Sequence, residues 1–186
     1  MPNTLKAKIL DEIASEIDQC RPCRIGAIGK AVPGEGDPDA RIVFVGEAPG
    51  KTEASTGRPF VGRSGQLLRQ LIRSAGLRDK NVYITSVVKY FPKSGTPLNT
   101  AIVHGETHLD KQLSTIDPDI VVLLGRVACV GVLGEERKVL KEHGEIAVKN
   151  GRYHLITLHP AAVLRYRDNL PIIKSDFEKL KKISAY

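Results

Sequence analysis

Four short apolar runs, separated by segments with helical periodicity, restrict the fold of this chain more than any other feature. The runs are residues 41–46, 82–88, 120–124 and 153–157. Continuous apolar runs of this length are typical of strands that are buried on both faces of a sheet. Helical spacing of apolar residues is found at 4–19, 66–75, 106–116, 126–133 and 172–183. Strands that alternate with helices predict an α/β fold, a three-layer α/β/α arrangement around a central four-stranded parallel sheet.

The length of the chain, 186 residues, fits one domain that spans residues 1–186. No internal repeat or low-complexity tract divides it. The apolar runs are much shorter than the roughly 20 residues needed to cross a bilayer. Acidic residues in the first helical segment argue against a signal peptide. We therefore expect a monomeric protein of the cytoplasm, associated with the nucleoid and without membrane contact.

The charge of the chain favours a polyanionic partner. Lysine and arginine number 28 against 21 aspartates and glutamates, which gives a net charge of +7. Each phosphate that such cations neutralise releases condensed counterions, and this release favours nucleic-acid binding. A protein that is merely basic has the same composition, so charge alone leaves both interpretations open.

Three loops are expected to meet at one edge of the predicted sheet, because ligands of such sheets bind where loops leave the carboxyl ends of the strands. These loops are residues 47–60, 89–100 and 158–167. The first offers Glu47 directly after a strand, and Phe60. A flat aromatic side chain there can stack on a nucleic-acid base, which is worth about 1–3 kcal/mol. Ordinary core packing of Phe60 and a solvated charge at Glu47 are the alternatives.

The first loop also contains the ending of a phosphate-binding P-loop, since residues 50–52 read Gly-Lys-Thr. That motif has four residues between its two glycines, whereas three separate Gly46 from Gly50. The helix that should start at Lys51 is expected to be interrupted by Gly57. A nucleoside-triphosphate site is therefore disfavoured.

The last loop combines a histidine with apolar and cationic residues. His159 follows a predicted strand and precedes Pro160, which suits the first turn of a helix. At this edge an imidazole can donate a hydrogen bond to developing negative charge, although a lone histidine is more often structural. Beyond it we expect an exposed apolar tip flanked by cations, an arrangement suited to prying a base from its stack. The residues of this tip are Val163, Leu164, Arg165 and Arg167.

Six motifs of the chain occur in the order and spacing of a known family. They are residues 46–50 (GEAPG), 57–62 (GRPFVG), 65–68 (GQLL), 82–85 (VYIT), 124–125 (LG) and 159–165 (HPAAVLR). The set resembles the family-4 uracil-DNA glycosylases, enzymes of base-excision repair that usually carry an iron–sulfur cluster. The resemblance extends from about residue 20 to about residue 165. It implies the fold of that superfamily and a monofunctional glycosylase, which flips uracil out of DNA and hydrolyses its N-glycosidic bond to leave an abasic site.

The resemblance also implies roles for the matching residues. Glu47 positions the attacking water and stabilises positive charge on the sugar, and Glu53 matches a second family carboxylate. His159 hydrogen-bonds a carbonyl oxygen of the base and stabilises the departing anion. The base pocket is expected to contain Gly46, Ala48, Ser86 and Phe60, whose ring stacks on the flipped base. The residues expected to contact DNA are Arg58, Lys89, Val163, Leu164, Arg165 and Arg167.

The chain departs from the family at Ser86, where the family usually has an asparagine whose amide reads the edge of uracil. A hydroxyl is shorter and can donate or accept, so it cannot impose the same hydrogen-bond pattern. Related family-5 enzymes also lack that asparagine and act on more deaminated bases. We therefore expect activity on uracil in DNA, with hypoxanthine and xanthine as further candidate substrates. A catalytically weak or inactive homologue that binds DNA or flipped bases without cutting is the alternative.

A second departure concerns the cluster, which four cysteines hold in the family. This chain keeps Cys20 and Cys23, but Tyr90 occupies the third position and the fourth falls between His104 and His108. Three interpretations stay open: a [4Fe-4S] cluster with histidine in place of cysteine, a zinc ion held by the two cysteines and histidines, or a remnant pair in a lobe closed by apolar packing. The glycosylase chemistry itself needs no cofactor.

Overall fold

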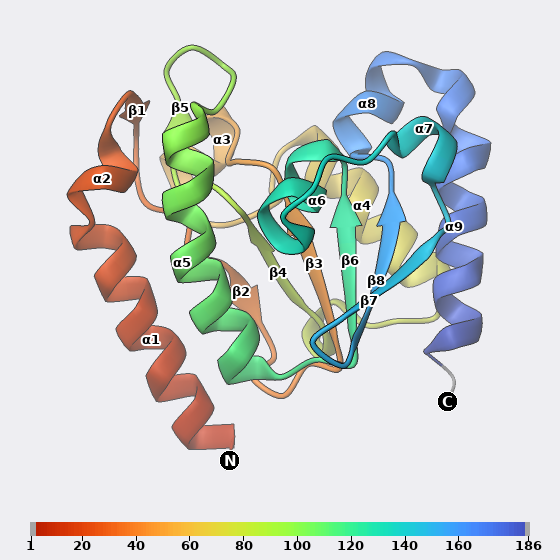
Figure 1. Cartoon of the computed structure of the whole chain (residues 1–186), viewed down its shortest axis with the longest axis horizontal. Coiled ribbons are helices and arrows are strands. Elements are labelled where there is room, and N and C mark those ends of the chain that lie inside the picture. The colour runs from red at the N-terminus through yellow and green to blue at the C-terminus, as the bar shows by residue number, and fades with distance from the viewer. Residues whose placement is uncertain (1–2, 185–186) are drawn as a thin grey trace.

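A six-stranded mixed sheet forms the central layer of the protein, between two layers of helices (Figure 1). The computed structural model describes residues 3–184. The strands lie in the order β2 (Glu35–Gly36), β4 (Tyr83–Ser86), β3 (Ile42–Gly46), β6 (Ile120–Leu124), β8 (Arg152–Thr157) and β7 (Ile146–Lys149). The four middle strands are parallel, and they are the strands that the apolar runs predict. The three-layer α/β fold is therefore confirmed.

The two edge strands are antiparallel and are not predicted by the apolar runs. β2 has two residues and pairs with β4. β7 pairs with β8 through a tight turn at Asn150 and Gly151, whose φ angles are 53° and 73°. An Asn-Gly pair is a strong signal for a two-residue hairpin, because both of its residues tolerate positive φ. That pair was the signal from which β7 could have been predicted.

Alternate residues of the central strands face opposite helical layers. In β3, Val43 and Val45 belong to one apolar cluster, whereas Ile42 and Phe44 belong to another. The helices of the first cluster are α1 (Asn3–Gln19), α5 (Asn99–Ile116) and α6 (Arg126–Leu133). Those of the second are α4 (Arg63–Ser74) and α9 (Leu170–Ile183). All five predicted helices are present, although α5 begins at Asn99 rather than at residue 106.

Short elements connect these layers. They are α2 (Arg21–Arg24), α3 (Lys51–Thr56), α7 (Val139–Glu142), α8 (Pro160–Arg165) and 3-10 turns at Asp79–Asn81 and Arg167–Asn169. β1 (Ala27–Ile28) and β5 (Phe91–Pro92) form a separate antiparallel ribbon. A helix does begin at Lys51, but it ends at Thr56 before Gly57, as expected, and the glycine spacing is wrong for a P-loop.

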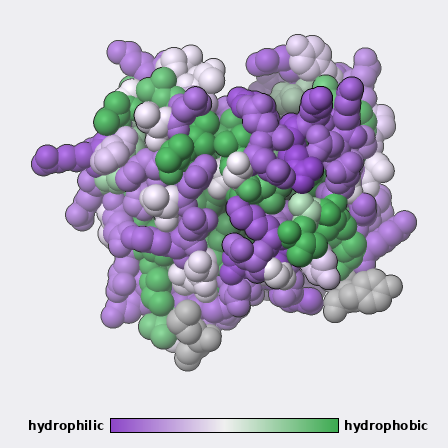
Figure 2. All heavy atoms as spheres, in the orientation of Figure 1, coloured by the Kyte–Doolittle hydropathy of each residue, from purple (hydrophilic) through white to green (hydrophobic). Residues whose placement is uncertain are grey.

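The surface is mostly hydrophilic on the face drawn in Figure 2, where apolar groups lie between polar ones. In the described part of the chain, no helix combines the length and the apolar character needed to cross a membrane.

Candidate active site

The three predicted loops meet at the carboxyl ends of the parallel strands and enclose a cleft of about 500 Å³. The first loop contributes Glu47 and Phe60, the second contributes Phe91, and the third contributes His159. Ser86, the last residue of β4, also faces the cleft. Seven residues that the sequence selects therefore line one cavity: Glu47, Ala48, Glu53, Phe60, Ser86, His159 and Arg165.

Phe60 is held beside the cleft in an unusual backbone conformation. Its φ of 49° lies in the left-handed region, which a bulky side chain rarely adopts. Gly65 allows α4 to approach closely, because a Cβ there would lie 1.9 Å from the Phe60 carbonyl oxygen. The Phe60 ring is 6% exposed and lies 5.7 Å from the His159 ring between centroids. Residues in such strained conformations cluster at functional sites. Phe60 packs against the core and also lines the cleft.

Gly46 provides the space that the Phe60 ring fills. A Cβ at residue 46 would lie 2.5 Å from ring atom Cζ of Phe60 and 3.2 Å from Oγ of Ser86. Gly46 thus lies behind Phe60 and Ser86, which line the cleft, and does not itself line it.

His159 is positioned by the helix that follows it. It is the N-cap of α8, with Pro160 at the first helical position, and its Nδ1 accepts a hydrogen bond from the Ala161 backbone N–H at 3.1 Å. An accepting Nδ1 requires that the proton of a neutral imidazole be on Nε2. Burial lowers the pKa of His159 to about 4. The side chain is therefore a neutral imidazole at physiological pH, with its N–H donor on Nε2.

Glu47 directly follows β3, and its backbone is held by the neighbouring strand. Its carbonyl oxygen accepts a hydrogen bond from the Val88 N–H at 3.0 Å. Burial raises the pKa of the half-buried Glu47 carboxyl, while the Arg126 guanidinium opposes that rise. Partial desolvation of a carboxylate strengthens its electrostatic interaction with a cation that forms nearby.

Glu53 holds the loop that presents Phe60. Its buried carboxylate accepts hydrogen bonds from the backbone N–H groups of Gly50, Val61 and Gly62 at 3.1, 2.8 and 2.7 Å. Both of its oxygens are engaged by these donors, although the residue also lines the cleft. This geometry favours a positioning role for Glu53 within the predicted catalytic set.

The prediction that Val163 forms part of an exposed tip is wrong. Val163 is 3% exposed and belongs to the apolar cluster of α4 and α9. The α8 helix turns one face toward α4, and Val163 lies on that face, whereas the next residue, Leu164, is 40% exposed.

The prediction that Lys89 contacts DNA is also wrong. Its side chain is buried, and Nζ donates to Thr85 Oγ1, the Ser86 carbonyl oxygen and Gln112 Oε1 at 2.9, 2.6 and 2.8 Å. Burial lowers the pKa of Lys89 to about 7. An amine enclosed in this way cannot reach a phosphate of DNA, and it instead stabilises the segment after β4.

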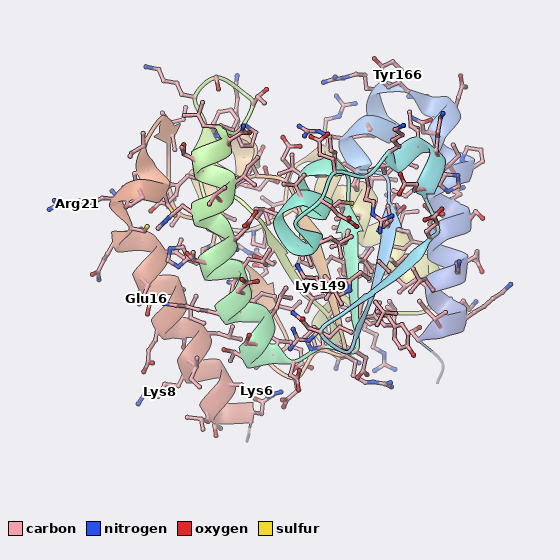
Figure 3. The ribbon with its side chains drawn as sticks, viewed as in Figure 1. Lys6, Lys8, Glu16, Arg21, Lys149 and Tyr166 are labelled. Atoms are coloured by element: carbon pink, nitrogen blue, oxygen red, sulfur yellow. The ribbon has the colours of Figure 1, made fainter. Side chains whose placement is uncertain are left out.

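The remaining predicted DNA contacts are exposed. Leu164, Arg165 and Arg167 lie on or just after α8, at the same edge of the sheet as the cleft. Arg58 is exposed too, although both Glu35 carboxylate oxygens accept hydrogen bonds from it at 2.8 and 3.0 Å. Tyr166, labelled in Figure 3, is 61% exposed in this stretch and was missed. An exposed aromatic between two arginines was the signal that could have selected it.

Two further cleft residues, Phe91 and Thr96, were not selected from the sequence. Both lie in the second predicted loop, so the topological argument placed their segment correctly. No motif distinguishes them within that loop.

A cluster of four side chains able to bind a metal lies apart from the cleft lining, between α1, α2 and α5. It consists of Cys20, Cys23, His104 and His108, whose ligand atoms all lie within 4.8 Å of one another. The third cysteine of the family pattern is replaced by buried Tyr90, whose hydroxyl donates to the Ile17 carbonyl oxygen at 3.1 Å. The space where α1, α2 and α5 meet is therefore occupied by polar side chains, and not by apolar packing alone.

The sequence matches known proteins over most of its length. Residues 33–183 match the family model described as the uracil DNA glycosylase superfamily. A Type-4 uracil-DNA glycosylase of Sulfurisphaera tokodaii is 40% identical, over 94% of this chain and 84% of that protein. A second one, of Thermotoga maritima, is 37% identical over 95% of both chains. A Type-5 uracil-DNA glycosylase of Pyrobaculum aerophilum is 32% identical over 72% of this chain and 66% of its own length.

Proposed function

Because the chain belongs to the uracil-DNA glycosylase superfamily, we propose that it flips uracil out of DNA and hydrolyses the N-glycosidic bond. The observation that carries this proposal is the meeting of Glu47, Phe60 and His159 in one cleft. Glu47 and Phe60 come from the first loop, and His159 comes from the third loop, about 100 residues later in the sequence. Their chemistry matches the three requirements of the reaction: an anion near the sugar, a stacking surface for the base and a donor for the leaving base.

Cleavage of the bond separates charge, and the cleft provides a group for each charge. The departing base becomes an anion, which the Nε2–H of His159 stabilises by donating a hydrogen bond. The sugar becomes oxocarbenium-like, and the Glu47 carboxylate stabilises it and orients the attacking water. Preorganised groups of this kind act at full strength because they do not have to reorient during the reaction.

Extrusion of the base costs a few kcal/mol, which binding must offset. Stacking on Phe60 supplies about 1–3 kcal/mol of this. Insertion of Leu164 into the duplex and phosphate contacts of Arg165 and Arg167 supply more. The protein acts on DNA as a monomer, with its net charge of +7 aiding association, and it works where DNA lies, in the nucleoid.

The reaction ends at the abasic site, without strand cleavage by a lysine. A lyase step needs a free amine beside the sugar, and Lys89 Nζ is buried and hydrogen-bonded three times. Lys51 is exposed and outside the cleft lining. The positions of these two lysines support a monofunctional enzyme.

A single-turnover assay tests the proposal. Oligonucleotides with one uracil, hypoxanthine or xanthine are incubated with excess protein, and half of each sample is then treated with alkali. We expect strand breaks from uracil only after alkali, since an abasic site is alkali-labile. Breaks without alkali would contradict the monofunctional assignment. Tight binding without cleavage of any substrate would favour the alternative, a homologue that recognises bases without cutting.

The Ser86→Asn substitution is expected to increase the preference for uracil over hypoxanthine. Ser86 lines the cleft beside Gly46, and a longer amide presents a fixed donor and acceptor where the hydroxyl presents either. Each pairing gained or lost at a base edge is worth about 1–3 kcal/mol, so the ratio of kcat/KM values should change by roughly 5- to 150-fold. The assay measures both substrates with both proteins. An unchanged ratio would show that residue 86 does not contact the base.

The Gly46→Ala substitution is expected to reduce cleavage by displacing Phe60. The new Cβ would lie 2.5 Å from the Phe60 ring, which lines the cleft and has to move to relieve the clash. Loss of stacking worth about 1–3 kcal/mol predicts a fall in kcat/KM of roughly 5- to 150-fold. Phe60→Ala and the Gly46→Ala, Phe60→Ala double variant serve as controls: once the ring is absent, Gly46→Ala should add little further loss. If Gly46→Ala cleaves at the wild-type rate, the ring does not occupy the position described.

A further inference from the structure

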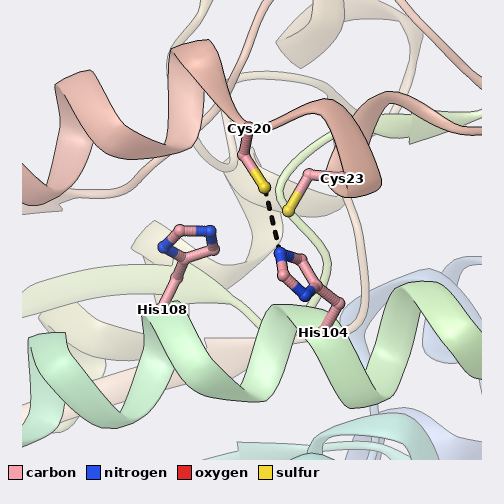
Figure 4. Close-up of side chains that lie close together, drawn as sticks. All are labelled: Cys20, Cys23, His104 and His108. Carbon is pink, nitrogen blue, oxygen red and sulfur yellow. Dashed lines mark hydrogen bonds between the residues drawn. The ribbon is translucent and has the colours of Figure 1, made fainter.

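The two cysteines and two histidines noted above lie together although they are distant in the sequence (Figure 4). Cys20 directly follows α1, and Cys23 lies in α2. His104 and His108 are four residues apart on α5, so both side chains leave the same face of that helix. Cys20 Sγ and His104 Nε2 are 3.0 Å apart. The site therefore joins the first helical segment of the chain to a helix about 84 residues later.

His108 shows that this group of side chains is incomplete as a hydrogen-bond network. It is 7% exposed, and neither of its ring nitrogens has a hydrogen-bond partner within residues 3–184. The His104 ring meets it edge-on, with centroids 5.5 Å apart. Burial of a polar nitrogen without a partner is costly, and buried polar groups almost always have one. A cation bound between the four side chains would supply the partner of one ring nitrogen.

The donor set does not fit the iron–sulfur cluster of the family. Such a cluster takes about four thiolates, and only two of the four side chains are cysteines. In a four-iron cluster each iron has its own protein ligand, so the ligand atoms point to separate corners of a cube. Here they converge within 4.8 Å of one another. Tyr90 also occupies the third ligand position of the family pattern, and its hydroxyl is hydrogen-bonded to the Ile17 and Asp18 carbonyl oxygens.

The same donors do fit one tetrahedral ion. Zinc binds sulfur at about 2.3 Å and nitrogen at about 2.0–2.1 Å. Four ligand atoms around it then lie roughly 3.3–3.8 Å apart, a separation that small side-chain rotations reach from the observed arrangement. Two thiolates and two imidazoles are a donor set for zinc or for a two-iron cluster, and the convergence of all four ligand atoms within 4.8 Å favours one ion, because a two-iron cluster places its cysteines and histidines on separate irons. We infer that Cys20, Cys23, His104 and His108 bind a single zinc ion in place of the cluster.

The position of the ion gives it a structural role. Four protein ligands leave no open coordination position, which is the mark of a structural zinc site. The site joins the end of α1 and α2 to α5, and the loop between β5 and α5 lines the cleft with Gly95 and Thr96. Zinc therefore stabilises the packing of α1 and α2 against α5, next to the loop that forms one wall of the cleft. It takes no part in the chemistry of Glu47 and His159.

Metal analysis of the purified full-length chain tests this inference. We expect about one zinc per chain, with negligible iron and acid-labile sulfide. Replacement by Co²⁺ should give the intense visible bands of a tetrahedral thiolate site. Removal of the metal with a chelator should lower Tm, and added zinc should restore it. These measurements do not depend on cleavage of DNA, so their failure is distinguishable from failure of the proposed function.

Matched variants separate the site from general effects of cysteine loss. Cys23→Ser and His104→Ala should each weaken zinc binding by more than roughly 100-fold, since loss of mere outer-shell partners already costs 10–100-fold. Cys129→Ser is the control, because Cys129 is buried in α6 and lies outside the group. If Cys23→Ser does not fold, zinc titration of the chelated wild-type chain still gives the stoichiometry. Iron with sulfide, a Cys20–Cys23 disulfide without metal, or a chelated chain that binds no zinc would overturn the inference.

Discussion

Replacing Glu47 with glutamine should slow cleavage of uracil-containing DNA by about 10²–10⁴-fold, the range for loss of a positioned acid–base group. The amide keeps the size of the side chain but removes the charge that stabilises the sugar and the base that orients the water. DNA affinity should not fall, because a carboxylate near the phosphate backbone repels it and the amide does not. Single-turnover kinetics and binding to an uncleavable uracil analogue measure the two quantities separately.

The pH dependence provides a second readout of the same residue. Burial raises the pKa of Glu47, and only the ionised form is active. Activity should therefore be low in acid and rise as pH increases through that raised pKa. His159, with a pKa of about 4, is already neutral there, so no further change is expected as pH passes the ordinary histidine value of about 6.5. Glu47→Gln should abolish the acid limb, whereas Glu178→Gln, exposed on α9, should leave rate and profile unchanged. An acid limb retained in Glu47→Gln would assign it to another group.

Replacing His159 with alanine should slow cleavage by about 10²–10³-fold, the cost of removing one donor to a developing anion. The donor is the Nε2–H, because Nδ1 accepts from the Ala161 N–H. The substitution also removes the N-cap of α8, for which a loss of about 1 kcal/mol in the free energy of unfolding is expected. Thermal unfolding must therefore be measured beside the kinetics, at a temperature where both proteins are folded.

A conservative variant separates chemistry from structure at this position. His159→Gln retains an N–H donor and should recover part of the rate that His159→Ala loses. A substrate whose leaving base is a more stable anion should lose less from His159→Ala than uracil does, because it needs less help in departing. Equal losses on both substrates, together with no recovery in His159→Gln, would reduce His159 to a residue that only shapes the loop.

The acid stability of the fold depends on the same histidine. The pKa of His159 falls from about 6.5 in the unfolded chain to about 4 in the folded one. Its contribution to stability is complete above the unfolded value and is lost as pH falls toward the folded value, since the unfolded chain takes up the proton first. This contribution disappears in His159→Ala, so the variant should lose less stability between neutral pH and pH 4 than the wild type.

The sequence determined the parallel core and the region of the site through local patterns. Buried strands need unbroken apolar runs, and the four runs specify β3, β4, β6 and β8 without any knowledge of their partners. Parallel pairing then places their carboxyl ends at one edge, which is why Glu47, Phe60 and His159 could be assigned to one cleft. The edge strand β7 was missed although its Asn150-Gly151 turn is a local signal.

Only the tertiary structure decided which side chains reach that cleft and which are enclosed. Val163 and Lys89 lie in segments at the correct edge, but their burial depends on α4 and on Gln112 of α5, which are remote in the sequence. The convergence of Cys20 and Cys23 with His104 and His108 likewise depends on the packing of α1 against α5. Local patterns report the periodicity of one segment, whereas burial and coordination are properties of surfaces that two distant segments form together.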